Sequence, residues 1–195
     1  MDTPSATPLS NWPFRWHVDV VEQTGSTNAD LLAAAAAGAP DRTVLVARHQ
    51  TAGRGRLDRR WDAPAGVNLL ASLLLRDVPE HPHVLTQRVG LAALLACERV
   101  AGVRPVLKWP NDLLLHEQKL AGVLAQAQFG ASPAVVVGIG INVGWAPDGA
   151  ARLGDGLDPL DVLAAMLTAY DELPDDVWLP YREHLATIGR HVKVE

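Results

Sequence analysis

A succession of short strand-like segments limits the fold of this chain more than any other feature of its sequence. Brief turns, and no helical pattern, separate the four segments of the second half, which cover residues 106–109, 112–115, 119–128 and 134–143. Strand-like segments of the first half cover His17–Glu22, Thr43–His49 and Asn68–Leu75, and a helical pattern follows the first and the third of them. Because the strands and helices follow no regular alternation, we expect an α+β fold with a mixed β-sheet flanked by helices, rather than a doubly wound parallel sheet.

The predicted helices carry recognisable end signals. Ser26 or Thr27 is a suitable cap for the first helix, and Gly38 a suitable stop after it. Asp158 followed by Pro159 places a capping carboxylate and a favoured first residue at the start of a later helix. We therefore expect four helices: one that begins at the Ser26 or Thr27 cap and continues through Ala37, and others over about 85–101, from Pro159 to about Leu173, and over about 176–188.

Composition narrows the class of protein. The 195 residues suit one domain, with or without a small appendage, and 48% of them are hydrophobic. A net charge of −5 argues against a general nucleic-acid binder, so no DNA partner is expected. The apolar runs are too short for a membrane span and the first twenty residues are unlike a secretion signal. Cys97 is the single cysteine, which predicts a buried, unreactive thiol and a cytoplasmic setting.

Basic residues gather in a loop between the second and third strands. Residues 51–61, Thr-Ala-Gly-Arg-Gly-Arg-Leu-Asp-Arg-Arg-Trp, alternate glycine with arginine and end on tryptophan. Glycine lets backbone N–H groups approach an anion, and arginine offers forked donors to carboxylate or phosphate. A solvated basic loop is the alternative interpretation. The pattern is not a P-loop, since no Gly-Lys-Ser/Thr follows.

Two of only three lysines lie in the most polar segment of the second half. Lys108 begins Lys-Trp-Pro-Asn-Asp112, and Lys119 begins Lys-Leu-Ala-Gly122, in a chain that otherwise uses fourteen arginines. A lysine supplies a compact point charge that arginine does not reproduce. Strict strand alternation would put Lys119 on one face with small side chains that leave room for a ligand, namely Ala121, Val123, Ala125 and Ala127. A hairpin with charged ends explains the same pattern without a ligand.

Glycines also alternate in the last predicted strand. Within Val136-Val-Gly-Ile-Gly-Ile-Asn142, strand alternation puts Gly138, Gly140 and Asn142 on one face. Two glycines on one face of an apolar strand indicate that a helix or a nucleotide approaches the backbone closely. A further short motif, Gly25-Ser-Thr-Asn28, suits a helix cap, and its hydroxyl and amide groups could equally hold a polar ring.

Taken in order, these motifs resemble those of the biotin protein ligases. The resemblance covers about residues 25–145 and rests on Gly25–Asn28, Gln50 with Gly53–Arg56, Lys108–Asp112, Lys119–Gly122 and Gly138–Asn142. It implies the family's mixed-sheet fold, related to class II aminoacyl-tRNA synthetases and lipoate ligases. It also implies that ATP, Mg²⁺ and biotin are used to form biotinyl-5'-adenylate, and that biotin then passes to a lysine of a biotin carboxyl carrier protein.

The resemblance assigns roles to individual residues. It implies that the biotin ring lies among Ser26, Thr27, Gln50 and Arg56, with Asn28 nearby. Arg54 and Lys119 would hold the biotin carboxylate and then the phosphate, and Asp112 would orient Lys119 or take a proton from the incoming amine. Trp61, Asn111 and Asn142 would lie around the adenine or its lid. The remaining predicted binding residues come from the same motifs: Gly53, Gly55, Lys108, Gly122, Gly138 and Gly140.

Physical chemistry agrees with these roles. A carboxylate that attacks a phosphate brings two anions together, so fixed cations and Mg²⁺ are needed to reduce the repulsion. The Mg²⁺ ligands stay unknown, because this ion relies mainly on phosphate oxygens and water. Four arginines close together repel one another, and the labile intermediate needs shelter from water. We therefore expect residues 53–62 to be mobile until a ligand binds.

Three departures from the family pattern qualify the expectation. Asp58 stands where a glycine is usual, and it weakens the positive field of the loop. No helix-turn-helix precedes the catalytic part, so no repressor role is expected. Residues 189–195 resemble the first strand of a truncated C-terminal β-barrel domain. We therefore divide the chain into a flexible tail (1–13), a catalytic domain (14–188) and the start of that barrel (189–195).

Two other functions stay open from the sequence. One is a biotin-binding module that no longer ligates, and the other is a lipoate or octanoyl ligase-like enzyme of the same fold. Biotin-dependent pyrophosphate exchange separates them from a biotin ligase. The sequence also leaves open which carrier is modified and whether the chain forms a weak homodimer.

Overall fold

The fold is described from a computed structural model that covers residues 12–57, 59–129 and 132–189. Asp58, most of the expected tail at 1–13 and nearly all of the segment predicted to begin a barrel at 189–195 lie outside these residues. The helices of the described part are all too short or too polar to cross a membrane.

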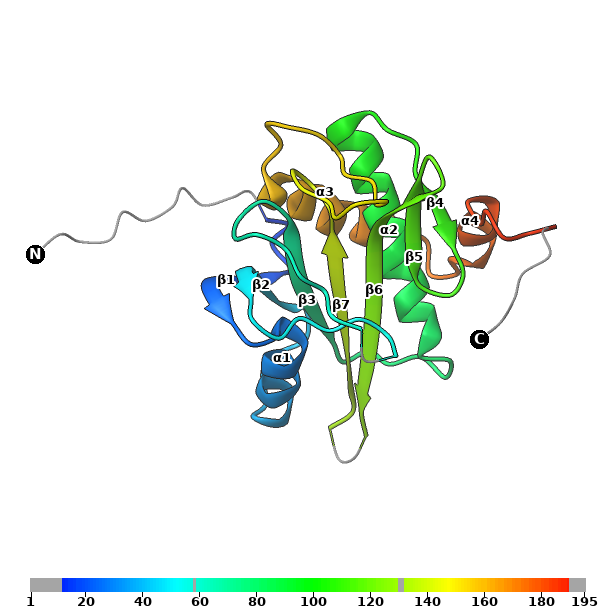
Figure 1. The fold of residues 1–195 in the computed structure, drawn as a ribbon. Helices are drawn as coiled ribbons and strands as arrows, with labels where there is room; N and C mark the ends of the chain where they lie inside the picture. Colours follow the sequence, from blue (N-terminus) through cyan, green and yellow to red (C-terminus); the bar gives the residue numbers. More distant parts are fainter. Residues whose placement is uncertain (1–11, 58, 130–131, 190–195) are drawn as a thin grey trace, which may run out of the picture.

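The described residues form one seven-stranded mixed sheet, as predicted (Figure 1). The strands lie in the order β1-β2-β3-β7-β6-β5-β4, and only β1 and β2 run parallel to each other. Their bounds are β1 His17–Thr24, β2 Thr43–Gln50, β3 Leu69–Leu75, β4 Val106–Lys108, β5 Asp112–Leu115, β6 Gln118–Gln128 and β7 Ala134–Ile141. The four later segments pair antiparallel with their neighbours because the turns between them are short.

Helices cover both faces of this sheet (Figure 1). Their bounds are α1 Thr27–Ala36, α2 His83–Ala101, α3 Pro159–Glu172 and α4 Trp178–Glu183. The predicted end signals are present at α3, where the Asp158 carboxylate accepts a hydrogen bond of 2.8 Å from the backbone N–H of Leu160. Gly38 follows α1 with φ +91°, a conformation that favours glycine.

The last predicted helix is shorter than expected. We expected about 176–188, whereas α4 ends at Glu183. The chain after it pairs with β4 instead: the Leu107 N–H donates to the His184 carbonyl at 2.9 Å, and the Ala186 N–H donates to the Leu107 carbonyl at 2.8 Å. Backbone groups of residues 184–186, which a longer helix would have paired internally, are thus hydrogen-bonded to the edge of β4 instead.

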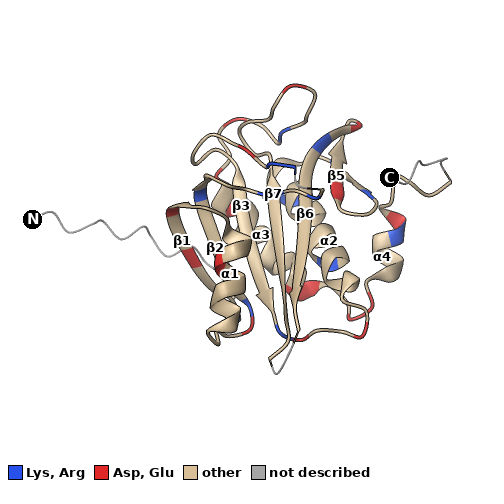
Figure 2. Ribbon diagram, turned by 60° about the horizontal axis from the view of Figure 1, so that its bottom comes forward, with Lys and Arg blue, Asp and Glu red and all other residues tan. Residues whose placement is uncertain are grey.

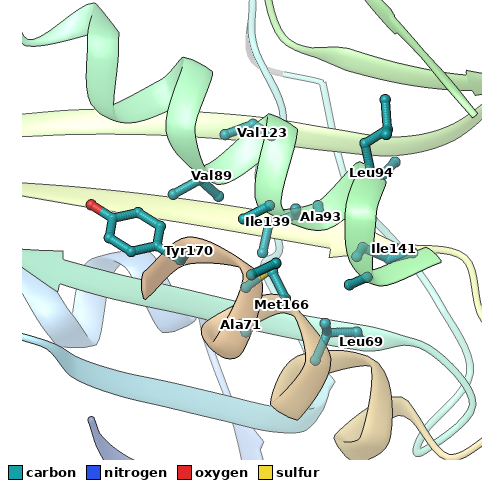
Figure 3. Packing of buried hydrophobic residues seen from close by; sticks show 14 of the residues in the cluster. Leu69, Ala71, Val89, Ala93, Leu94, Val123, Ile139, Ile141, Met166 and Tyr170 are labelled. Carbon is teal, nitrogen blue, oxygen red and sulfur yellow. The ribbon is translucent and has the colours of Figure 1, made fainter. Parts of the chain in front are cut away.

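The main core lies between the sheet and the pair α2 and α3 (Figure 3). Alternate residues of the two central strands point into it, including Leu69 and Ala71 of β3 and Ile139 and Ile141 of β7. On the opposite face, α1 packs a smaller cluster against one end of these strands, formed by Leu31, Ala35, Leu74, Ala134 and Val136. Since α1 covers only that end, the rest of this face is left to the loop of residues 51–66, which crosses β3, β7 and β6 (Figure 1).

Candidate active site

Two adjoining cavities lie on the face of the sheet that carries α1. The inner cavity leaves about 50 Å³ free and the outer cavity about 550 Å³. The inner cavity is lined by residues of α1, β2, β6, β7 and the basic loop, among them Ser26, Thr27, Asn28, Gln50, Arg54, Gly122, Gly138 and Gly140. The outer cavity is lined among others by Arg59, Arg60, Asp62, Asp112, Asn142, Trp145, Pro147 and Ala150. Five residues line both cavities: Gly55, Arg56, Trp61, Asn111 and Lys119.

The glycines of β7 form the floor of the inner cavity, and each has a side chain directly above it. A Cβ at Gly138 would lie 2.2 Å from Oδ1 of Asn28, and one at Gly140 would lie 2.4 Å from Cε2 of Trp61. The predicted close approach is therefore present. At Gly138 it is made by the first turn of α1, and at Gly140 by an indole from the basic loop.

Trp61 stands between the two cavities with a free donor. Its indole covers Gly140 and comes within 3.2 Å of a Cβ placed at Gly122. Among the described residues, no atom accepts a hydrogen bond from its buried Nε1. A buried N–H without a partner costs free energy, so this site suits a ligand that brings an acceptor.

Polar side chains fill the end of the inner cavity nearest α1. The Gln50 side-chain oxygen accepts from the backbone N–H of Thr27 at 2.8 Å and lies 3.1 Å from the Thr27 hydroxyl. Beneath Thr27 and Asn28 lies Ser72 of β3, which is completely buried and hydrogen-bonded to both. Sequence reasoning missed Ser72, because one serine within a run of leucines has no distinguishing pattern.

A β-bulge in β6 directs Lys119 into the site. Pairing with β5 shifts register, so that Leu113 faces Ala121 while Leu114 faces Lys119. Leu120 is the extra residue, and it lies in the main core together with Ala121. The alternation restarts after the bulge, which brings Lys119 to the same face as Gly122.

This corrects the expectation that Lys119 shares a face with Ala121 and Val123. Both of those side chains lie in the main core on the other side of the sheet. The small residue beside Lys119 is Gly122 instead, where a Cβ would lie 3.2 Å from the lysine Nζ.

Lys119 and Asp112 form an ion pair at the junction of the cavities. The lysine Nζ lies 2.8 Å from Oδ1 of Asp112, with side chains 41% and 22% exposed. The same ammonium group lies 5.6 Å from the ring centroid of Trp61. Lys119 therefore keeps part of its charge accessible to a ligand while Asp112 and the indole restrict its position.

The basic loop folds back on itself above these groups. The Gly55 N–H donates to the Arg59 carbonyl at 2.6 Å, and the Trp61 N–H donates to the Gly53 carbonyl at 3.0 Å. A Cβ at Gly53 would lie 2.3 Å from the Trp61 carbonyl oxygen, so this glycine shapes the loop and lines neither cavity. Figure 2 shows the basic segments of the loop lying across β7 and β6. The mobility expected of residues 53–62 without a ligand stays a prediction.

One arginine of the loop reaches the far side of the site. Arg56 donates to Oδ1 of Asn111 at 3.1 Å, and Nδ2 of Asn111 donates to the Val123 carbonyl at 2.9 Å. The guanidinium groups are exposed to solvent or to the cavities, and they bring a high density of positive charge to a concave surface.

The outer wall depends on two buried asparagines. Asn142 lines the outer cavity and donates through Nδ2 to the Ala151 carbonyl at 2.9 Å, so its amide holds the wall. Oδ1 of Asn68 accepts from the backbone N–H groups of Val143 and Trp145 at 3.0 and 3.1 Å. Sequence reasoning missed Asn68, because it precedes β3 and stands far from the segment that it supports.

One predicted binding residue lies apart from the site. Lys108 is exposed at the end of β4 and lines neither cavity. In this short edge strand only Leu107 faces inward, and it contributes to the core.

Within the described residues, no group of three or more His, Cys, Asp and Glu side chains could hold a metal ion. Cys97 is buried as predicted, and burial raises the pKa of its thiol to about 12.

Known proteins are similar to this chain in both sequence and fold. Residues 20–142 match the model of the biotin/lipoate A/B protein ligase family. A biotin–[acetyl-CoA-carboxylase] ligase of Mycobacterium tuberculosis is 42% identical over 200 residues, which cover 91% of this chain and 74% of that protein. The bifunctional ligase/repressor BirA of Bacillus subtilis is 39% identical over 134 residues, which cover 67% of this chain and 40% of that protein.

A solved structure of a related protein has a similar fold, in agreement with these sequence similarities. The biotin protein ligase of Aquifex aeolicus in complex with biotin and ATP superposes with a TM-score of 0.69 at 32% identity, covering 80% of this chain and 69% of that one. A mixed sheet with cationic groups between two adjoining cavities places the chain among acid-activating ligases. It belongs to the biotin/lipoate A/B protein ligase family.

Proposed function

We propose that this chain is the catalytic part of a biotin–[acetyl-CoA-carboxylase] ligase. It joins biotin to ATP as biotinyl-5'-adenylate and then transfers the biotinyl group to a lysine of a biotin carboxyl carrier protein. The observation that carries the proposal is the position of Lys119 and Arg56, which line both cavities at once. An acid held in one cavity and a nucleotide held in the other would react where these two cations lie.

Biotin belongs in the inner cavity. Its ring is small and polar at one end, which matches the hydroxyl and amide groups of Thr27, Asn28 and Gln50. The free volume of about 50 Å³ is small for the whole ligand, so the Trp61 indole and the loop must shift outward as biotin enters. The carboxylate end would then point toward Lys119.

The first half-reaction joins two anions. A biotin carboxylate oxygen attacks the α-phosphorus of ATP, and pyrophosphate leaves with the electrons of the broken P–O bond. Lys119 and Arg56 lower the repulsion between carboxylate and phosphate, and Arg59 and Arg60 line the outer cavity where the leaving phosphates would lie. The family resemblance gives this role to Arg54 in place of Arg56; Arg54 lines the inner cavity, where it would hold the biotin carboxylate. The free Nε1 of Trp61 is available to an acceptor of the bound nucleotide or acid.

The second half-reaction releases AMP. The carrier lysine attacks the acyl carbon, the C–O bond to the phosphate breaks, and the amine loses a proton. Asp112 lies at this junction and is the nearest carboxylate to Lys119, which suits it to orient that ammonium group or to take the proton. A lysine amine must lose its proton before it attacks, because its usual pKa is about 10.4.

The residues of the outer cavity fit a Mg²⁺ ion that accompanies ATP. Asp62 and Asp112 both line this cavity, and Mg²⁺ in nucleotide sites usually binds one or two carboxylates together with phosphate oxygens and water. Such an ion would neutralise phosphate charge next to the arginines.

Pyrophosphate exchange tests the proposal directly. The chain is incubated with ATP, Mg²⁺, labelled pyrophosphate and either biotin, lipoate or octanoate, and label in ATP is measured. We expect exchange with biotin only. Exchange with lipoate or octanoate but not biotin would assign the chain to the other branch of the family, and biotin binding without exchange would indicate a binding module.

A further inference from the structure

Ser72 is a buried polar residue that lines neither of the two cavities, yet it is hydrogen-bonded to two residues that line the inner one. It is the only polar residue of β3, has no exposed surface, and lies opposite Gly138 of the neighbouring strand. Thr27 and Asn28 cover it from the first turn of α1. The direction of the hydrogen bonds among these three side chains decides what the cavity can offer to a ligand.

The orientation of the Asn28 amide follows from its partners. Nδ2 lies 3.1 Å from the Leu124 carbonyl oxygen and 2.9 Å from Oε1 of Gln126. A backbone carbonyl only accepts, so Nδ2 must face it, and Oδ1 must face Ser72 at 2.6 Å. Because Oδ1 only accepts, the single hydroxyl proton of Ser72 is donated to Asn28.

The Thr27 hydroxyl is then fixed in turn. Its oxygen lies 2.7 Å from the Ser72 oxygen, and a contact that short needs a proton between the two oxygens. Ser72 has none left, so Thr27 donates to Ser72. The alternative acceptor, Oε1 of Gln50, lies farther away at 3.1 Å and already accepts from the Thr27 backbone N–H.

We infer that Ser72 is a positioning residue that makes the Thr27 oxygen an acceptor toward the inner cavity. With its proton directed away from the cavity, Thr27 accepts a hydrogen bond from a ligand N–H and repels a ligand oxygen at the same position. This inference rests on the proposed function and deepens it: the site selects a cyclic ligand that carries an N–H donor, such as the ureido ring of biotin.

Ligand analogues measure this selectivity. Dissociation constants are determined by calorimetry for biotin and for two cyclic carbamates, in each of which one ureido N–H is replaced by oxygen. The replacement removes a donor and brings two oxygens together, so the unmodified chain should bind one of the carbamates at least tenfold more weakly than biotin.

The Ser72→Ala variant tests the role of the serine. It frees the Thr27 hydroxyl to turn and donate to a ring oxygen. Biotin should bind about tenfold more weakly, and the preference for biotin over that carbamate should shrink at least tenfold. Ser72→Cys, with a weaker donor of similar shape, should give an intermediate preference and carries the test if the alanine variant does not fold. Leu74→Val, on the same strand and face, is the matched control and should keep the full preference.

The outcomes separate the two hypotheses. If Ser72 were purely structural, its replacement would weaken the binding of biotin and of both carbamates by the same factor. An unchanged preference in a folded Ser72 variant would therefore overturn the inference while leaving the proposed function intact. Failure of the unmodified chain to bind biotin would overturn the proposed function, and this inference with it.

Discussion

Replacement of Lys119 by alanine gives the largest expected loss of catalysis. At an effective dielectric constant of about 20, two unit charges about 4 Å apart interact by about 4 kcal/mol, which is the upper limit for the missing attraction. The side chain is 41% exposed and already paired with Asp112, so solvent and that carboxylate reduce the effect. A loss of about 3 kcal/mol remains, equivalent to roughly 10²-fold in the rate of adenylate formation.

Biotin-dependent pyrophosphate exchange measures that rate. Binding of biotin to Lys119→Ala should fall by less than about tenfold, because an exposed ion pair with the carboxylate contributes only about 1 kcal/mol. The control is Arg104→Ala, which removes an exposed charge of the same sign away from both cavities and should keep full exchange. Exchange by a folded Lys119→Ala variant within threefold of the unmodified chain would refute the assigned role.

Three further predictions concern the frame of the site. Gly140→Ala should displace the Trp61 indole, which a Cβ would meet at 2.4 Å, and should change tryptophan fluorescence and weaken biotin binding; Gly25→Ala, with nothing within 4 Å, should do neither. Asn68→Ala leaves one buried and one partly buried N–H group without their acceptor and should lower the free energy of unfolding by about 2–4 kcal/mol in urea titrations, and an effect under about 0.5 kcal/mol would contradict this reasoning. The Cys97 thiol, with its pKa raised to about 12 by burial, should react with a disulfide reagent at pH 8 only as fast as the chain unfolds.

The order of strands and turns was enough to predict the sheet. Short turns after residue 106 require antiparallel neighbours, and end signals at Gly38 and Asp158 placed two helices well. The paired glycines of β7 also indicated a crowded strand face, since few other features explain glycine at alternate positions of an apolar strand.

Features that depend on distant partners could not be predicted in this way. The bulge at Leu120 arises from pairing with β5, and strict alternation along β6 alone gives the wrong face for Lys119. Ser72 and Asn68 gain their importance from contacts 45 and 75 residues away, with Thr27 and Val143 respectively, which no local pattern records. The shortness of α4 likewise follows from the free edge of β4.

The most direct test of the account is a crystal structure with a hydrolysis-resistant acyl sulfamate analogue of biotinyl-5'-adenylate. We predict the ring beside Thr27 in the inner cavity, the adenosine in the outer cavity, and the sulfamate between the Lys119 ammonium group and the Arg56 guanidinium group. An analogue bound with its sulfamate away from both cations, or with both ends in one cavity, would contradict the account.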